Sequence, residues 1–140
     1  MKKRLTIIQM DVHVNDVEYN YTRVQELLSQ SLSENPDIIV LPETWNTGFY
    51  PSKELINIAD RNGERTKSLL STFAKKHNVN IVGGSVAVAK NDVVFNTSYA
   101  YNREGTLVGE YSKMHGFSPA KEDQYFAGGT HTTHFELDGI

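Results

Sequence analysis

The chain of 140 residues is long enough for one hydrophobic core and too short for two. It has 39% hydrophobic and 22% charged residues and a formal net charge of −3, an ordinary balance for a soluble domain. Lysines and arginines are scattered, which argues against nucleic-acid binding, and no apolar run reaches membrane-spanning length. With zero cysteines these residues supply no disulfide, thiolate metal site or cysteine nucleophile.

The first apolar segment, residues 5–10, is too short and too polar for the core of a signal peptide, so we expect a cytoplasmic protein. Its pattern predicts a strand instead. A helix should follow, capped by Asn15 with Glu18 completing a capping box, and run to about residue 33. Because a second strand follows at 36–42, the βαβ order predicts that these two strands are parallel neighbours.

Further periodicity predicts a helix over 66–77 and a strand over 80–88. Gly83 and Gly84 within that strand indicate a bulge or a close approach of another backbone. An alternating strand at 93–101, a turn at 102–105 and a returning strand at 106–111 form a hairpin. Residues 134–137 look like the beginning of another strand. One α/β layer structure fits these elements best.

The stretch around which the chain is organised is the second strand, where Ile38 to Leu41 are consecutively apolar, as in a strand buried on both faces. Pro42 cannot donate to a sheet ladder, so the strand should end there and leave Glu43 just past its carboxyl end. Open α/β sheets hold their ligands at that edge. We expect Glu43 to act as a general base, with Trp45 and Phe49 walling a pocket beside it.

Two later stretches have the same character. Lys113, in Tyr-Ser-Lys-Met-His, follows another predicted strand, where its positive charge could stabilise an oxyanion. Glu122 and Asp123 precede the aromatic pair Tyr-Phe and a double glycine. Each of these stretches is unspecific when taken alone.

Taken together, the three stretches resemble the nitrilase superfamily of carbon–nitrogen hydrolases, in the order that this family has them. Supporting residues are Gln9, Gly83-Gly84-Ser85 and Phe95-Asn96-Thr97. The resemblance covers essentially the whole chain and implies an α/β fold, the amino-terminal portion of a four-layer αββα sandwich. It also implies hydrolysis of a nitrile, amide or carbamoyl group by a Glu–Lys–Cys triad, with no metal and no organic cofactor.

Carried over by motif, Glu43 would be the general base and Lys113 the oxyanion stabiliser. Glu122, or less fittingly Asp123, would be a second acid that supports the base and the substrate. We assign substrate binding to Trp45, Phe49 and His115. Residues 43–49, Glu-Thr-Trp-Asn-Thr-Gly-Phe, resemble most the omega-amidase group, which hydrolyses small α-keto acid amides.

The family's nucleophilic cysteine lies on a strand that residues 132–140 would lead into. We therefore expect residues 1–140 to be a carbon–nitrogen hydrolase domain that is incomplete at its carboxyl end and inactive alone, since hydroxyl side chains lack the ready nucleophilicity of a thiolate. The full-length form should take a small-molecule amide as substrate and assemble as a homodimer or larger homo-oligomer, as the family commonly does.

Two alternatives stay open. A metal-dependent phosphoesterase of the endonuclease/exonuclease/phosphatase type also places a Glu after an Asp-Ile-Ile-x-Leu strand, but its first strand normally offers an Asn where this chain has only Gln9. A non-catalytic truncated hydrolase half that acts as a binding partner is the other. His131 and His134 could be half a metal site, but in a strand they would face opposite sides, so we expect solvated histidines. The paired glycines match no nucleotide-binding motif.

Overall fold

The first two strands lie side by side, as the βαβ order predicts. In the computed structural model, which describes residues 2–140, β1 (Leu5–Ile7) pairs in parallel with β2 (Ile38–Val40). The helix α1 (Val17–Ser31) forms the crossover between them. The prediction of parallel neighbours is therefore confirmed.

The remaining strands extend this pair into a mixed sheet of seven strands in the order β1-β2-β4-β6-β5-β3, with β7 also paired to β6. β4 (Asn80–Val82) continues the parallel part, and β6 (Val93–Tyr101) runs antiparallel to it. β5 (Val86–Lys90) follows β4 along β6, while β7 (Leu107–Ser112) is antiparallel to β6. Two reversals give β7 the direction of β2, so both strands end at the same edge of the sheet.

The predicted strand over 80–88 is thus interrupted. β4 ends at Val82 and β5 begins at Val86, and the glycine pair between them includes Gly84 in the left-handed region at φ +59°. The predicted strand over 93–101 is confirmed as β6, and so is its hairpin with β7. A short strand, β3 (Asp60–Arg61), pairs with β5 at the far side and was not predicted.

The cap of α1 differs from the prediction. Asp16, not Asn15, is the cap, and its carboxylate accepts the main-chain N–H of Tyr19 at 3.1 Å. Asn15 takes a left-handed conformation at φ +63° one residue too early to reach that N–H group. Glu18 does not complete a capping box, since its carboxylate pairs with Arg65 of the neighbouring helix.

The second long helix, α3 (Glu64–His77), begins two residues before the predicted start. Asp60 explains this, because its carboxylate accepts the N–H groups of Arg65 at 3.2 Å and Thr66 at 2.8 Å and so caps the first turn from a distance. The basic last turn lies where the helix dipole favours positive charge. Four short helical elements complete the chain: η1 (Leu32–Glu34), α2 (Leu55–Ile58), η2 (Ser118–Ala120) and α4 (Glu122–Tyr125).

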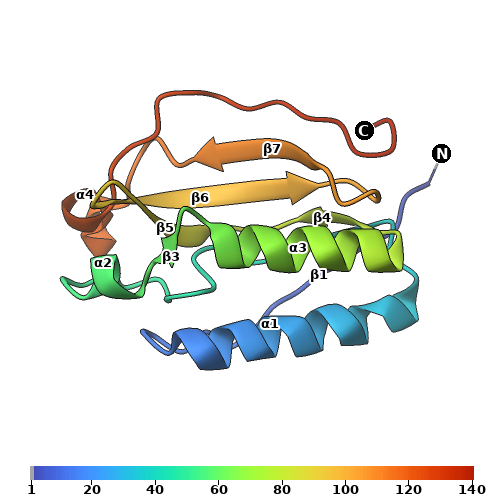
Figure 1. Ribbon diagram of the computed structural model, residues 1–140, viewed down its shortest axis with the longest axis horizontal. Coiled ribbons are helices and arrows are strands. Elements are labelled where there is room, and N and C mark those ends of the chain that lie inside the picture. The colour runs from blue at the N-terminus through green and yellow to red at the C-terminus, as the bar shows by residue number, and fades with distance from the viewer. Residues whose placement is uncertain (1) are drawn as a thin grey trace.

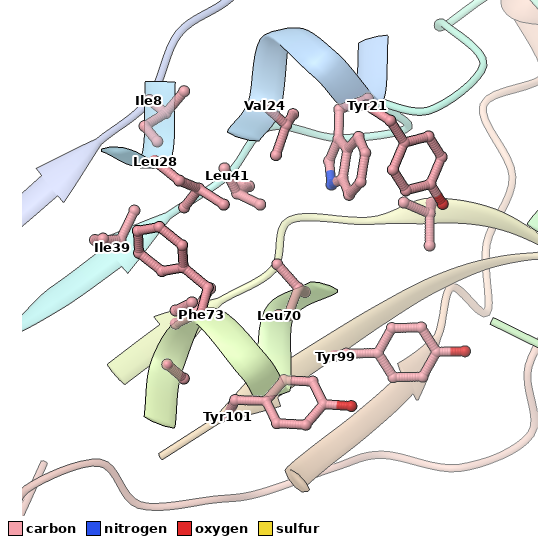
Figure 2. Packing of buried hydrophobic residues seen from close by; sticks show 14 of the residues in the cluster. Ile8, Tyr21, Val24, Leu28, Ile39, Leu41, Leu70, Phe73, Tyr99 and Tyr101 are labelled. Atoms are coloured by element: carbon pink, nitrogen blue, oxygen red, sulfur yellow. The ribbon is translucent and has the colours of Figure 1, made fainter. Parts of the chain in front are cut away.

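The main core lies between these two helices and one face of the sheet (Figures 1 and 2). Helix α1 contributes Tyr21, Val24 and Leu28 at spacings of three and four residues, which puts them on one side of the helix. Figure 2 shows these side chains meeting others from α3 and the strands, among them Ile39, Leu41, Leu70, Phe73, Tyr99 and Tyr101. Burial of this apolar surface holds both helices on the sheet.

The last segment runs back along β7 after α4, as Figure 1 shows, but it is not a strand. Thr133 donates its hydroxyl to the Glu110 carbonyl at 2.6 Å, and the ring of Phe135 lies against Gly109. These are side-chain contacts without a main-chain ladder, so the prediction of a strand at 134–137 is wrong for this structure. His131 and His134 are both exposed, as predicted.

The mixed sheet with its helices confirms the predicted α/β fold class. Residues 2–140 form one sheet and one layer of helices. Within residues 2–140 we find no helix with the length and apolar character needed to cross a membrane.

Candidate active site

Glu43 lies at the edge of the sheet, three residues beyond the end of β2. The segment that carries it is fastened to Ser85, whose N–H donates to the Pro42 carbonyl at 3.0 Å and whose hydroxyl accepts the N–H of Thr44 at 3.0 Å. Thr44 itself has a φ of +44°, a strained conformation for a β-branched residue. The main chain on both sides of Glu43 is therefore held in place.

Gly84 makes this attachment possible. A Cβ atom there would lie 1.9 Å from the Pro42 carbonyl oxygen, and its φ of +59° is one that other residues rarely adopt. The close backbone approach predicted from the paired glycines is confirmed. Only glycine lets the chain between β4 and β5 pass directly beside the segment that carries Glu43.

Lys113 reaches Glu43 from the same edge of the sheet. It directly follows β7, and its N–H donates to the Asn96 carbonyl at 2.8 Å, which continues the ladder by one residue. The ammonium nitrogen lies 2.7 Å from Glu43 Oε1. Two residues that are 70 apart in sequence are brought into contact because β2 and β7 end at the same edge.

Glu122, the first residue of α4, closes the cluster from the other side of Lys113. Its side chain is 1% exposed, and its Oε2 atom lies 2.9 Å from Lys113 Nζ and accepts the N–H of Phe117 at 2.6 Å. Asp123 is exposed and lines a small cavity together with Lys113 and Glu122, but no ion pair joins it to Lys113 or to the other described residues. Of the two acids left open by the sequence, the structure brings Glu122 to Lys113.

The electrostatics of the cluster keep Lys113 charged. Partial burial by itself lowers the pKa of Lys113, but its hydrogen bonds to Glu43 and Glu122 and their negative charges outweigh this effect. The pKa of Lys113 is therefore raised above the ordinary lysine value. At neutral pH the site presents a fixed ammonium group held between two carboxylates.

Trp45 does not wall a pocket, and the prediction of that position is wrong. Its side chain is fully buried in the main core, edge-on to Tyr21, and its indole N–H donates to the Gly83 carbonyl at 2.9 Å. An aromatic side chain of this size gains more from the core than from a solvent-exposed rim. The Glu43 side chain, 45% exposed, is accordingly not shielded by Trp45.

Phe49 and His115 remain at the surface. The Phe49 ring is 37% exposed and lies 6.2 Å from the ring of Phe117, the residue whose N–H binds Glu122. Phe49 and Phe117 therefore form an aromatic rim beside the cluster. The His115 side chain is exposed and takes no part in the hydrogen bonds of Glu43, Lys113 and Glu122.

Asn96, in β6, is a member of the cluster to which the sequence assigns no role beyond its part in the family resemblance. Its side-chain Nδ2 donates to Glu43 Oε1 at 3.0 Å. The available signal was a run of three polar residues, Asn96 to Ser98, within a strand that is otherwise apolar and aromatic, and that signal does not say which partner each residue has.

Two cavities lie near these residues. One of about 200 Å³ is lined by Asn96, Lys113, Glu122 and the glycine-rich turn at 128. A larger one of about 610 Å³ shares Ala127 and Gly128 with it, and its charged groups, Lys90 and Glu110, already pair with each other at 2.7 Å. The smaller cavity is the one that contacts the Lys113 cluster. Among residues 2–140 we find no group of three or more His, Asp or Glu side chains arranged to hold a metal ion.

Comparison with known proteins gives consistent results. The carbon–nitrogen hydrolase family matches residues 4–138. A 2-oxoglutaramate amidase from Bacillus subtilis is 39% identical over 140 residues, which is 100% of this chain and 53% of the relative. An omega-amidase from Danio rerio is 31% identical over 83% of this chain and 41% of its own length.

Among solved structures, a CN-hydrolase superfamily protein from Xanthomonas campestris, described with an arsenic adduct in its active site, superposes with a TM-score of 0.85 at 28% identity. The match covers 98% of this chain and 50% of that one, so the chain spans about half the length of the relatives it matches. The family match, the relatives and the superposition agree with the site geometry: the chain belongs to the carbon–nitrogen hydrolase family.

Proposed function

We propose that this chain supplies the acid–base half of a small-molecule amidase of the omega-amidase kind. In this proposal Glu43 is the general base and Lys113 stabilises the oxyanion, while the nucleophile is a cysteine thiol from sequence beyond residue 140. The observation that carries the proposal is the position of the Lys113 ammonium, 2.7 Å from Glu43 and 2.9 Å from Glu122.

The two carboxylates differ in a way that suits different tasks. Glu122 is buried and is committed to Lys113 and to the Phe117 N–H, so it serves to fix the ammonium. Glu43 is exposed, and a carboxylate that reaches open space can exchange protons with an incoming thiol or water. Lys113 has three N–H donors, which leaves one for a substrate oxygen after the two acids are served.

The reaction then proceeds in two halves. Glu43 takes the thiol proton as sulfur attacks the amide carbon, and the carbonyl electron pair moves to oxygen beside Lys113. Collapse of this intermediate breaks the carbon–nitrogen bond, and ammonia leaves with the proton from Glu43. Water, deprotonated by Glu43, next attacks the thioester. Release of the carboxylic acid returns the proton to the thiol.

The substrate class rests on the relatives. One is described as a 2-oxoglutaramate amidase and another as an omega-amidase, so we propose a small α-keto acid amide as substrate. We further propose a cytoplasmic protein that forms a homodimer or larger homo-oligomer in its full-length form. Phe49, whose ring lies 6.2 Å from that of Phe117, and His115, two residues after Lys113, are the proposed contacts for the substrate.

The site geometry disfavours the phosphoesterase alternative. In such an enzyme Glu43 would hold a divalent cation, whereas here the Lys113 ammonium occupies the space between Glu43 and Glu122. Two positive charges at one place would repel each other strongly. Addition of EDTA separates the two chemistries, since it should leave an amidase unaffected.

A binding half without activity is the second candidate, favoured by exposed apolar side chains on β1. Leu5 is 54% exposed and Ile7 is 70% exposed, an arrangement that usually marks a surface covered by another segment. Aggregation of the isolated 140-residue chain would agree with this need for a cover. A soluble, monomeric 140-residue chain would contradict it.

The test of the main proposal is ammonia release from 2-oxoglutaramate and from simple aliphatic amides, measured for the 140-residue chain and for a longer protein that continues to the proposed cysteine. We expect turnover by the longer protein alone, unchanged by EDTA and abolished by iodoacetamide. Turnover by the cysteine-free chain, or turnover that survives alkylation of every thiol, would contradict the proposed nucleophile.

A further inference from the structure

We propose that Asn96 is a positioning residue that sets the orientation of the Glu43 carboxylate and thereby selects Oε2 as its basic oxygen. This inference rests on the proposed function, because it assigns a task to a neighbour of the proposed base. It gives a task to a residue that the family resemblance includes without a role and that the proposed triad does not include.

The hydrogen bonds of Glu43 carry the argument. Asn96 Nδ2 and Lys113 Nζ both donate to Oε1, at 3.0 Å and 2.7 Å, and the hydrogen bonds that the Glu43 carboxylate receives from residues 2–140 all fall on this oxygen. The amide must present nitrogen to Glu43, because an amide oxygen would be repelled by the carboxylate. Two donors on one oxygen fix the rotation of the carboxyl group and leave Oε2 available for a proton.

The position of Asn96 makes it a rigid support. It lies within β6, paired to Ala87 of β5, and is 3% exposed. Its carbonyl also accepts the N–H of Lys113 at 2.8 Å, so one residue holds the base through its side chain and the lysine through its main chain. A functional group held by a strand interior is placed more accurately than one held by a loop.

Packing alone does not explain an asparagine here. Its Oδ1 atom is buried and has no partner among residues 2–140, which is energetically costly. An apolar side chain of similar size would avoid that cost. The residue also lines the cavity of about 200 Å³ next to Lys113 and Glu122. The asparagine therefore leaves its Oδ1 atom unpaired while its Nδ2 group donates to Glu43.

The chain offers a matched control in Asn80. It is also fully buried in the sheet, its Nδ2 donates to the Asp37 carbonyl at 3.0 Å, and its Oδ1 also lacks a partner among the described residues. Asn80 is the first residue of β4. Glu43 follows the carboxyl end of β2, which runs parallel to β4. The two asparagines thus lie at opposite edges of the sheet.

The experiment compares Asn96→Leu with Asn80→Leu in the longer protein, measuring kcat and KM for amide hydrolysis and the thermal unfolding midpoint. Each substitution removes a hydrogen bond made by a buried amide, so both should lower the thermal unfolding midpoint. Only Asn96→Leu should lower kcat, by about 10- to 100-fold with KM changed less than about threefold, because it misorients the base without touching substrate. Equal kcat for both variants, or a kcat within about twofold of the unsubstituted protein for Asn96→Leu, would overturn the proposal.

A second variant separates orientation from packing. Asn96→Asp keeps the shape of the side chain but turns an oxygen toward Glu43, so we expect kcat to fall at least as far as in Asn96→Leu. If the kcat of Asn96→Asp equals that of the unsubstituted protein, the Nδ2 donor is dispensable and the proposal is overturned.

Failure of the proposed function is recognised separately. If the unsubstituted longer protein releases no ammonia from any amide, the amidase assignment fails, and a crystal structure of Asn96→Leu still tests the orienting contact. A Glu43 carboxylate rotated away from Lys113 in that structure supports it. An unmoved carboxylate overturns it.

Discussion

Lys113 lies between two carboxylates that differ sharply in exposure: Glu43 is 45% exposed and Glu122 is 1% exposed. The ammonium group approaches both closely, at 2.7 Å and 2.9 Å. Because the buried acid cannot move without losing its contacts to Lys113 and to the Phe117 N–H, it anchors the lysine, while the exposed acid keeps one side open to solvent.

Removal of the Lys113 charge should abolish most activity. In the longer protein we expect Lys113→Met to lower kcat by about 100- to 1,000-fold, the usual cost of losing an oxyanion donor. Lys76→Met is the matched control, since Lys76 is exposed on α3 and the substitution is the same. Steady-state ammonia release measures both, and a decrease below about fivefold for Lys113→Met would exclude the oxyanion role.

Glu122 and Asp123 are adjacent in sequence but should respond differently. Glu122→Gln weakens the anchor of Lys113, so we expect kcat to fall by about 100-fold. Asp123→Asn, at an exposed position, should stay within about twofold of the unsubstituted protein. The kcat values of the two variants decide between the acids that the sequence left open, and a larger effect for Asp123→Asn would reverse the assignment.

Gly84 should tolerate no side chain. Gly84→Ala places a methyl group 1.9 Å from the Pro42 carbonyl oxygen at a φ of +59°, and we expect it to lower the free energy of unfolding by at least about 3 kcal/mol. Gly139 has a φ of +82°, and a methyl group added there would meet nothing within 4 Å, so Gly139→Ala should cost only about 1–2 kcal/mol. Urea unfolding gives both values, and equal costs would contradict the close approach.

Arg103 should stabilise the protein in a pH-dependent way. A main-chain hydrogen bond from Arg4, helped by Arg103, lowers the pKa of Asp37, and hydrogen bonds from Arg103 lower the pKa of Asp138. Carboxyl groups with a lowered pKa in the folded state contribute stability above their unfolded pKa of about 4, and this contribution is lost as the pH falls through the folded pKa.

Arg103→Met should therefore destabilise the protein at pH 7 and lose this effect progressively below about pH 4. Urea unfolding of both proteins from about pH 7 to about pH 2 measures the difference. Arg23→Met serves as the control, because Arg23 pairs with Glu26 on the exposed side of α1 and should have little effect at any pH. A difference for Arg103→Met that does not change with pH would contradict this explanation.

Hydrophobic periodicity was sufficient to predict α1 and α3, which each bury one face, and the hairpin of β6 and β7. The parallel pair of β1 and β2 could be predicted from their βαβ order. The two-residue β3 and the four-residue α2 have no such repeat and depend on neighbours distant in sequence. Capping of α3 by Asp60, which lies outside the helix in β3, is likewise a contact that local patterns do not reveal.

The part of the site that could be predicted is the position of Glu43 and Lys113 after the ends of strands. Glu43 and Lys113 each follow a predicted strand, whereas the strand order that brings both strand ends to one edge of the sheet was not predicted. The prediction for Trp45 was wrong because an aromatic residue after a strand suits a pocket wall and a core equally well. The hydrogen bond from Asn96 to Glu43 could not be predicted, because it depends on contacts between residues distant in sequence.

The most direct test of the account is the initial rate of ammonia release from 2-oxoglutaramate by the longer protein carrying Glu43→Gln, compared with Glu104→Gln in the exposed turn after β6. If Glu43 is the base, its substitution lowers the rate by at least about 100-fold, and the Glu104 substitution leaves it within about twofold. Retention of a tenth or more of the rate by Glu43→Gln would contradict the central claim.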